Sequence, residues 1–320
     1  MSNASVVSLE RLSRLPWIWS YLGAGIVWLG AMAFTGGTGG GGMLTAALSF
    51  AVFSVVVGLG QMFVITLGPG NTDLSIPANI GLAGAVAMKL MGGDDAMIVP
   101  AVLAALATGA AVGLVNYGII AILRIPPIVA TLSSSFLIQS VAISYGRGLL
   151  IKPPPAFAAF TTATVFGVPV LAIAALIFSI LVAVVLERTL FGRSVSAFGQ
   201  NNRAAWLAGL PVVRTQLATY VLCGALAGLA GALLGGFSGG ATLDMGSEYL
   251  LTSIAVVVIG GTSVSGGRAN VPGIWGAALF MFLLVTMLNT WGFGSGVRLI
   301  LTGIIIIAVI VLAGGDRATR

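Results

Sequence analysis

The feature that most constrains this chain is a succession of ten apolar segments, most of them near the ~20 residues that an α-helix needs to cross a bilayer. Charged residues make up 7% of its 320 residues, against roughly 25% in soluble proteins, so a soluble fold could not cover its surface. Backbone in lipid must satisfy its own hydrogen bonds, and no barrel-like alternation is present, so the segments are predicted to be helices. They are Trp17–Phe34, Leu44–Thr66, Leu74–Met91, Met97–Leu123, Ile128–Tyr145, Val165–Leu186, Val212–Leu234, Leu250–Ser263, Ile274–Thr290 and Val297–Leu312.

The sequence thus predicts an all-α membrane protein of about ten transmembrane helices, forming one domain over residues 1–320. Two glycine-rich stretches, 68–77 and 260–268, interrupt the apolar pattern. Irregular backbone at membrane depth is tolerated only where it lines a cavity or is buried in protein, so these stretches predict broken or re-entrant elements. The apolar part of the eighth segment, Leu250–Ile259, gives only about 15 Å of helix, which leaves open whether it spans.

The basic residues predict the orientation, because cytoplasmic loops are enriched in Lys and Arg. With the N-terminal segment 1–16 in the cytoplasm, ten spans return the C-terminus to the same side. Ten of the 14 basic residues then lie inside and four outside. The inner set is Arg11, Arg14, Arg124, Arg188, Arg193, Arg203, Arg214, Arg268, Arg317 and Arg320, and the outer set is Lys89, Arg147, Lys152 and Arg298.

Several kinds of chemistry are excluded by the residues present. The chain has no histidine, one cysteine (Cys223) and eight acidic residues, which argues against a metal site, a cofactor or a membrane enzyme. Neither lysine lies in a phosphate-binding loop, since Lys89 precedes Leu90 and Lys152 precedes Pro153. If ATP drives this protein, another chain hydrolyses it. The scattered basic residues fit membrane topology and not nucleic acid binding.

The longest polar interval is residues 187–213, predicted to be a cytoplasmic loop. Within this interval Asn201–Leu210 is predicted to be a short helix, capped by Asn201 or Asn202. Small alanines on one side suit docking in a groove of a partner protein, whereas a helix that merely anchors the loop at the membrane surface is an equally good interpretation. The candidate contact residues are Asn201, Asn202, Arg203, Ala204, Ala205 and Gly209.

Uncharged polar residues lie within or beside the apolar segments, as a path for a neutral, hydrogen-bonding solute would require. Each of them separately is more typical of hydrogen bonding between helices, and Asp73 also suits a helix cap. Glycine pairs such as Gly109/Gly113 and Gly224/Gly228 indicate close helix packing. The uncharged path candidates are Ser75, Asn79, Asn116, Ser133, Gln139, Thr262, Ser263 and Asn289, and the acidic Asp73 at the mouth of the third segment is a further candidate.

Four stretches resemble, in order and spacing, the permease subunits of bacterial ABC importers for monosaccharides, of the ribose, xylose, arabinose and galactose branch. They cover most of the chain, from about residue 50 to residue 313. The stretches are Asp73-Leu74-Ser75 with its flanking glycines, Arg124-Ile125-Pro126-Pro127-Ile128-Val129-Ala130-Thr131-Leu132, the loop from Phe191-Gly192-Arg193 to Gly209, and 255–268 with its Ile-Gly-Gly-Thr-Ser and Ser-Gly-Gly motifs.

The resemblance implies a fold like that of type II ABC importers, in the inner membrane. Two permeases, identical or different, would surround a central path. ATP-binding subunits would dock on residues 201–210, and a periplasmic sugar-binding protein would deliver the solute. The chain departs from the family where Arg203 replaces the usual Glu of the coupling loop, and where Thr72 and Pro77 replace Ile and Gly.

Two functions follow as hypotheses. The first is the transmembrane subunit of an ATP-driven importer for a sugar or a related neutral polar solute. The alternative is a carrier driven by an ion or proton gradient, which needs an acidic residue at membrane depth. Asp73 is the one candidate for that role.

Overall fold

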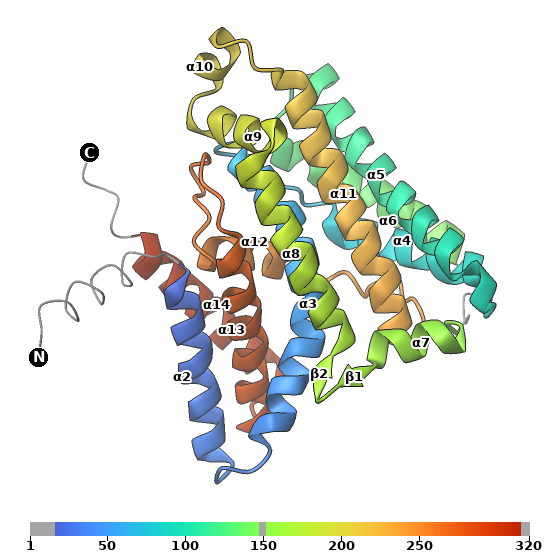
Figure 1. Ribbon diagram of the computed structural model, residues 1–320, viewed down its shortest axis with the longest axis vertical. Coiled ribbons are helices and arrows are strands. Elements are labelled where there is room, and N and C mark those ends of the chain that lie inside the picture. Colours follow the sequence, from blue (N-terminus) through green and yellow to red (C-terminus); the bar gives the residue numbers. More distant parts are fainter. Residues whose placement is uncertain (1–16, 147–151, 315–320) are drawn as a thin grey trace, which may run out of the picture.

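The computed structural model describes residues 17–146 and 152–314, and these are almost entirely helical (Figure 1). The predicted N-terminal segment 1–16 lies outside the described residues, as do Arg147, Arg317 and Arg320. Six helices are long and apolar enough to cross a membrane. They are α3 (Gly40–Thr66), α5 (Ile98–Leu123, continuing the 3-10 turn η1 at Asp95–Met97), α6 (Pro127–Gly146), α8 (Val170–Arg188), α11 (Val212–Phe237) and α13 (Val271–Thr290).

Four further apolar helices occupy the remaining predicted segments. They are α2 (Ile18–Phe34), α4 (Ile76–Met91), α12 (Tyr249–Ile259) and α14 (Ser295–Gly314). Each of the ten apolar segments is therefore helical over most of its length, whereas ten membrane crossings remain a prediction. At 1.5 Å per residue, α12 is about 16 Å long, roughly half of a ~30 Å hydrocarbon core.

The sixth predicted segment begins too early. Residues 164–169 form a hairpin of two short antiparallel strands, β1 (Thr164–Val165) and β2 (Val168–Pro169), and α8 starts only at Val170. The apolar composition suggested helix, but Phe166-Gly167 forms a two-residue turn and Pro169 ends the strand before α8. The short helix α7 (Pro155–Thr162) precedes this hairpin.

Both predicted breaks are present in the structure. Residues 67–75 are non-helical between α3 and α4, and residues 260–270 are non-helical between α12 and α13. The glycine-rich stretch between the first two predicted segments is only partly a loop, because Gly40, Gly41 and Gly42 form the first turn of α3.

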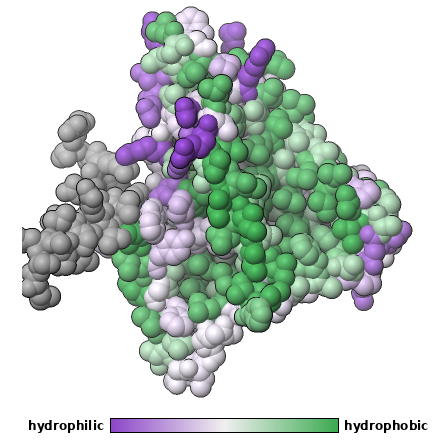
Figure 2. Space-filling model, in the orientation of Figure 1, coloured by the Kyte–Doolittle hydropathy of each residue, from purple (hydrophilic) through white to green (hydrophobic). Residues whose placement is uncertain are grey.

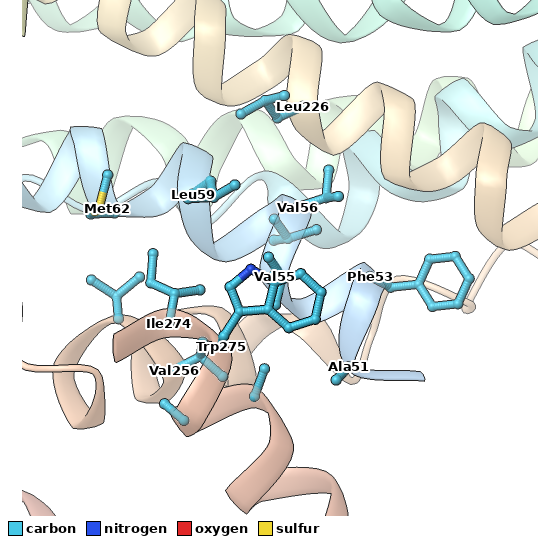
Figure 3. Packing of buried hydrophobic residues seen from close by; sticks show 14 of the residues in the cluster. Ala51, Phe53, Val55, Val56, Leu59, Met62, Leu226, Val256, Ile274 and Trp275 are labelled. Carbon is cyan, nitrogen blue, oxygen red and sulfur yellow. The ribbon is translucent and has the colours of Figure 1, made fainter. Parts of the chain in front are cut away.

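Helix α3 forms the centre of the core, since every residue from Val55 to Thr66 is buried. Its apolar side chains pack against α11, α12 and α13 (Figure 3). Trp275 of α13 lies among them, and its indole N–H donates to the Ser179 hydroxyl of α8 over 2.9 Å. This bond satisfies a polar group that would otherwise be costly to bury.

Helices α5 and α11 are in close contact, and they cross at the glycines that the sequence marked. A methyl group on Gly109 would collide with the Gly224 carbonyl, and one on Gly113 with the Tyr220 carbonyl. The two helices run antiparallel, so Arg124 at the end of α5 lies near the start of α11. Contacts at this distance require glycine, because any side chain would force the backbones apart.

The two ends of the molecule differ in charge. The described members of the inner basic set all lie near the end that carries α10 (Asn202–Leu207), while Lys89, Lys152 and Arg298 lie near the opposite end. In Figure 2 hydrophilic residues gather at the α10 end and at a far corner, with a broad hydrophobic surface between them. Such a belt suits a lipid bilayer.

Candidate functional site

Helices α9 (Leu190–Gln200) and α10 form a compact projection at one end of the molecule (Figure 1). Thr189 caps α9 by accepting a bond from the Gly192 N–H over 3.2 Å, and Asn201 caps α10 by accepting one from the Ala204 N–H over 2.9 Å. Of the two predicted caps, Asn201 and Asn202, the structure therefore uses Asn201. Helix α9 itself was not predicted, although a capping Thr before an amphipathic stretch was the signal for it.

Gly209 ends the projection in a defined way. Its φ is +77°, its N–H donates to the Trp206 carbonyl, and the Leu210 N–H donates to the Ala205 carbonyl. These two bonds form a Schellman motif, in which glycine is favoured because it has no Cβ to clash at positive φ. Gly209 thus has a structural role that is sufficient to explain it.

The exposed face of α10 differs from the one expected. Ala205 is buried against the rest of the chain, and Ala204 is exposed beside Asn201, Asn202 and Arg203. Trp206 and Leu207 are 66% and 70% exposed. The surface that α10 presents therefore combines a large apolar pair, Trp206 and Leu207, with the exposed Ala204 and Ala208. Exposed aromatic and aliphatic anchors of this kind are typical of protein interfaces.

Two breaks in the chain meet the end of α9 beneath this projection. We call Thr66, Gly68, Gly199, Gly266 and Gly267 the glycine junction. A methyl group on Gly199 would collide with the Thr66 carbonyl and with Gly267, and one on Gly266 would collide with Gly68. The Gly267 N–H donates to the Thr66 carbonyl over 2.9 Å. The junction joins α9 to the break after α3 and to the break after α12.

The break after α12 has a definite structure. The buried Thr262 hydroxyl accepts a bond from the Asn270 N–H over 3.2 Å, while the Ser263 N–H donates to the Arg268 carbonyl over 3.0 Å. Asn270 in turn caps α13 through the Gly273 N–H. The Thr262 hydroxyl therefore stabilises the loop 260–270. A cleft of about 530 Å³ separates this loop from α9, lined in part by Glu187, Arg193, Gln200 and Arg268.

The break after α3 leads into a buried polar cluster, formed by Asp73, Ser75, Asn116, Thr131 and Ser134. Asp73 accepts bonds from the backbone N–H and the hydroxyl of Ser75, over 2.9 and 2.7 Å. The Asn116 amide group donates to the Ser75 hydroxyl over 2.7 Å and to both Asp73 carboxyl oxygens over 3.3 and 3.4 Å. Ser134 donates to the Asn116 amide oxygen.

The cluster joins three helices to the break. Thr131 of α6 accepts a bond from the Leu74 N–H over 3.0 Å, and the Gln61 amide oxygen of α3 accepts one from the Asp73 N–H over 3.2 Å. Asp73 is 1% exposed and Asn116 is 0% exposed. All these partners of the Asp73 carboxyl group are uncharged. Asp73 is not itself the N-cap of α4, which is Ser75, but it fixes the turn that leads into the helix.

The other path candidates lie away from this cluster. Asn79 is buried at the α5–α11 crossing, where its amide group donates to the Gly224 carbonyl over 3.0 Å. Gln139 donates to the Leu243 carbonyl over 3.4 Å. Ser133 is exposed on α6, and the exposed Asn289 accepts a bond from Arg298 at the far end of α13.

Three members of this region were not among the predicted site residues. Thr131 and Ser134 are three residues apart and thus share one face of α6, whereas Ser133 lies about 100° away from Ser134 around the helix. Helical spacing relative to Thr131 was the available signal. Gln61 gave no local signal, because a lone glutamine in an apolar helix is compatible with many packing arrangements.

The comparisons with known proteins agree with this architecture. The family described as "Branched-chain amino acid transport system / permease component" matches residues 42–312. The chain belongs to this permease family. The monosaccharide permeases that its motifs resemble are also represented among its relatives, which confirms the resemblance.

Two relatives show how closely the permease matches characterised transporters. It is 33% identical over 261 residues to the ribose import permease protein RbsC of Bacillus subtilis, covering 80% of each chain. It is 32% identical over 249 residues to the autoinducer 2 import system permease protein LsrD of Escherichia coli K12, covering 76% of this chain and 75% of the relative. No solved structure gives a significant match. The family and the apolar helices together make this a multi-pass membrane protein.

Proposed function

We propose that this permease is the transmembrane subunit of an ATP-driven importer for a sugar or a related neutral polar solute. The observation that carries the proposal is the α9–α10 projection, whose base contacts both breaks in the membrane helices through the glycine junction. A subunit that moves α10 would therefore displace backbone at two places inside the helix bundle. The two relatives named above are import permeases for ribose and for autoinducer 2.

The ATP-binding subunit is proposed to dock on Asn202, Arg203, Trp206 and Leu207, with the α10 end in the cytoplasm. Six described arginines near this end fit that orientation, because basic residues favour the cytoplasmic side. Related permeases usually carry Glu at the position of Arg203 in the coupling loop. Arg203 would instead contact an acidic or polar group of the ATP-binding subunit. Both chain ends are then cytoplasmic and the chain crosses the inner membrane ten times.

The solute is proposed to pass between two permease copies or between this chain and a paralogue, after delivery by a periplasmic binding protein. Asp73, Ser75 and Asn116 are fully buried within one chain, so they would support the path wall and not line it in this conformation. Gln139 and Ser263, which are partly exposed, and Ser133, which is exposed, remain proposed lining residues. The uncharged character of these groups suits a solute rich in hydroxyls.

The test is reconstitution in proteoliposomes with the ATP-binding subunit and binding protein encoded beside the permease. Uptake of labelled ribose, xylose, arabinose and galactose is measured with ATP, without ATP, and with ATP plus a protonophore. The proposal predicts ATP-dependent uptake of at least one sugar, insensitive to the protonophore. Uptake that the protonophore abolishes while ATP remains would instead support the gradient-driven carrier, with Asp73 as its acidic group.

A further inference from the structure

We infer that the β1–β2 hairpin is a membrane anchor, and that Phe166 at its tip inserts among the lipids of the leaflet opposite α10. The inference rests on α8 crossing the membrane and is independent of the transported solute. Three observations carry it: the backbone of the turn, the exposure of the side chain, and the position of the hairpin at the end of α8.

The turn holds a residue that its backbone does not favour. Val165 pairs with Val168, so Phe166 and Gly167 are the two central residues, with φ of +51° and +78°. Two positive φ values mark a type I′ turn, for which Asn-Gly is the preferred sequence. A bulky aromatic residue at positive φ is strained. Strain of this kind is typical of functional positions.

The Phe166 side chain does not pack in the protein interior. It is 103% exposed, as fully as a side chain can be, and its neighbours Val165 and Val168 are also exposed. The turn is nevertheless fixed in place, because the Thr45 hydroxyl of α3 donates to the Gly167 carbonyl over 2.9 Å. The Val170 N–H closes the hairpin on the Ala163 carbonyl over 2.9 Å. A rigid support therefore presents the phenyl ring outward.

The position of the hairpin indicates that lipid is what surrounds the Phe166 side chain. Helix α8 has 19 residues, or about 28 Å of length, which matches a ~30 Å hydrocarbon core. Its end at Arg188 lies at the α10 side, so the hairpin before Val170 falls at the opposite membrane–water boundary. Trp and Tyr are enriched at that depth, and Phe166 shares their aromatic ring without the polar group, which suits the apolar side of the boundary.

The surroundings of Phe166 are also those of a lipid contact. No charged residue occurs between Lys152 and Glu187. The apolar residues of α8 that follow the hairpin, Ile173, Leu176, Ile177 and Ile180, are exposed as well. The hairpin thus continues the bilayer-facing surface of α8. A site for a water-soluble protein partner would carry a rim of polar and charged side chains, whereas the exposed polar side chains between residues 153 and 186 are two threonines, Thr162 and Thr164.

The test measures the depth of a spin label at the hairpin in nanodiscs of phosphatidylethanolamine and phosphatidylglycerol. Cys223, the one native cysteine and a buried one, is replaced by alanine, and single cysteines are introduced as Phe166→Cys and Val168→Cys. Ile177→Cys in the middle of α8 and Arg203→Cys on α10 are the bilayer and water controls. Collision rates with oxygen and with a water-soluble nickel chelate report depth.

Labels at 166 and 168 are expected to collide more with oxygen than with the chelate, at a depth between the two controls. Chelate accessibility at 166 equal to that at 203 would overturn the inference. So would immobilisation of the label by added periplasmic binding protein, or spin–spin broadening between two copies. Val168→Cys carries the same prediction if Phe166→Cys fails to fold.

A stability measurement separates the anchor from the turn. Phe166→Asn supplies the preferred Asn-Gly turn but removes the ring, so it is expected to keep the fold in detergent. Its gain in Tm on transfer from detergent to nanodiscs should be smaller than that of the wild type by a few degrees, and Phe166→Trp should restore the gain. Equal gains in wild type and Phe166→Asn would contradict the anchor.

Discussion

Glycine brings backbone segments together at two places in this permease, with different consequences. At the α5–α11 crossing, Gly109, Gly113 and Gly224 allow two long, regular helices to touch. At the glycine junction, Gly199 and Gly267 bring a helix end against two breaks in the chain. The crossing joins elements whose internal hydrogen bonds keep them rigid. The junction joins elements that end there, so small rotations at their ends cost little.

This difference suggests a division between a rigid frame and a moving part. The frame is α5, α11 and the buried polar cluster, which is linked to the crossing through Asn116 on α5. The moving part is the α9–α10 projection with residues 67–72 of the first break and the loop 260–270, while Asp73 and Ser75 belong to the frame through the polar cluster. Hinges of switching proteins are commonly loop or element-terminal residues, which is the character of the junction.

The largest effect is expected in the rigid frame. Gly113→Ala places a methyl group against the Tyr220 carbonyl, while Gly118→Ala on the same helix meets no atom within 4 Å. Overpacking of this kind costs typically about 1–3 kcal/mol, and contact with backbone puts Gly113→Ala at the upper end. Thermal unfolding in detergent should show a large fall in Tm for Gly113→Ala. A similar Tm for both variants would contradict the rigid crossing.

The buried polar cluster is expected to rank next. Asn116→Ala removes the donor to Asp73 and Ser75 and the acceptor of Ser134. Leaving buried polar groups without partners costs about 1–3 kcal/mol, so the free energy of unfolding should fall by that amount. Asn116→Asp is a matched variant, because it keeps the shape but sets a second carboxyl group against Asp73. If Asn116→Ala unfolds like the wild type but loses transport, the cluster belongs to the moving part.

Docking is expected to depend on the exposed pair of α10. Trp206→Ala and Leu207→Ala remove large side chains that the chain itself does not bury. Truncation of an interface anchor typically weakens binding by about 2 kcal/mol, or some 30-fold. Binding of the ATP-binding subunit to permease in nanodiscs measures this, with unchanged Tm as the control. Unaltered affinity in both variants would place the docking surface elsewhere.

The smallest effect is expected for Ser133. Its side chain is exposed on α6, whereas Ser134 one residue later bonds Asn116 inside the cluster. Ser133→Ala should change stability by less than about 0.5 kcal/mol, and Ser134→Ala should cost about 1 kcal/mol. Unfolding curves of the two variants distinguish them. A loss of uptake in Ser133→Ala with normal stability would mark it as a residue of the path.

Much of this architecture follows from the sequence, because apolar length and glycine-rich interruptions report directly on membrane helices and their breaks. The α10 cap was also predictable, because Asn201 bonds a backbone N–H only three residues later in the chain. The exposed face of α10 was not predictable from the sequence. Ala205 is buried and Trp206 is exposed because of the way in which α9 positions α10. Likewise the apolar composition of residues 164–169 is typical of a helix, and only the Phe166-Gly167 turn indicates a pair of strands instead.

The glycine junction is expected to transmit motion of α10 to the helix breaks. This expectation is tested most directly by the number of sugar molecules transported per ATP hydrolysed in proteoliposomes, compared between wild type and Gly199→Ala. The added methyl group opens the junction but leaves the exposed face of α10 intact. ATP hydrolysis is expected to persist in Gly199→Ala, while the ratio falls at least tenfold. An unchanged ratio in a folded Gly199→Ala protein would contradict it.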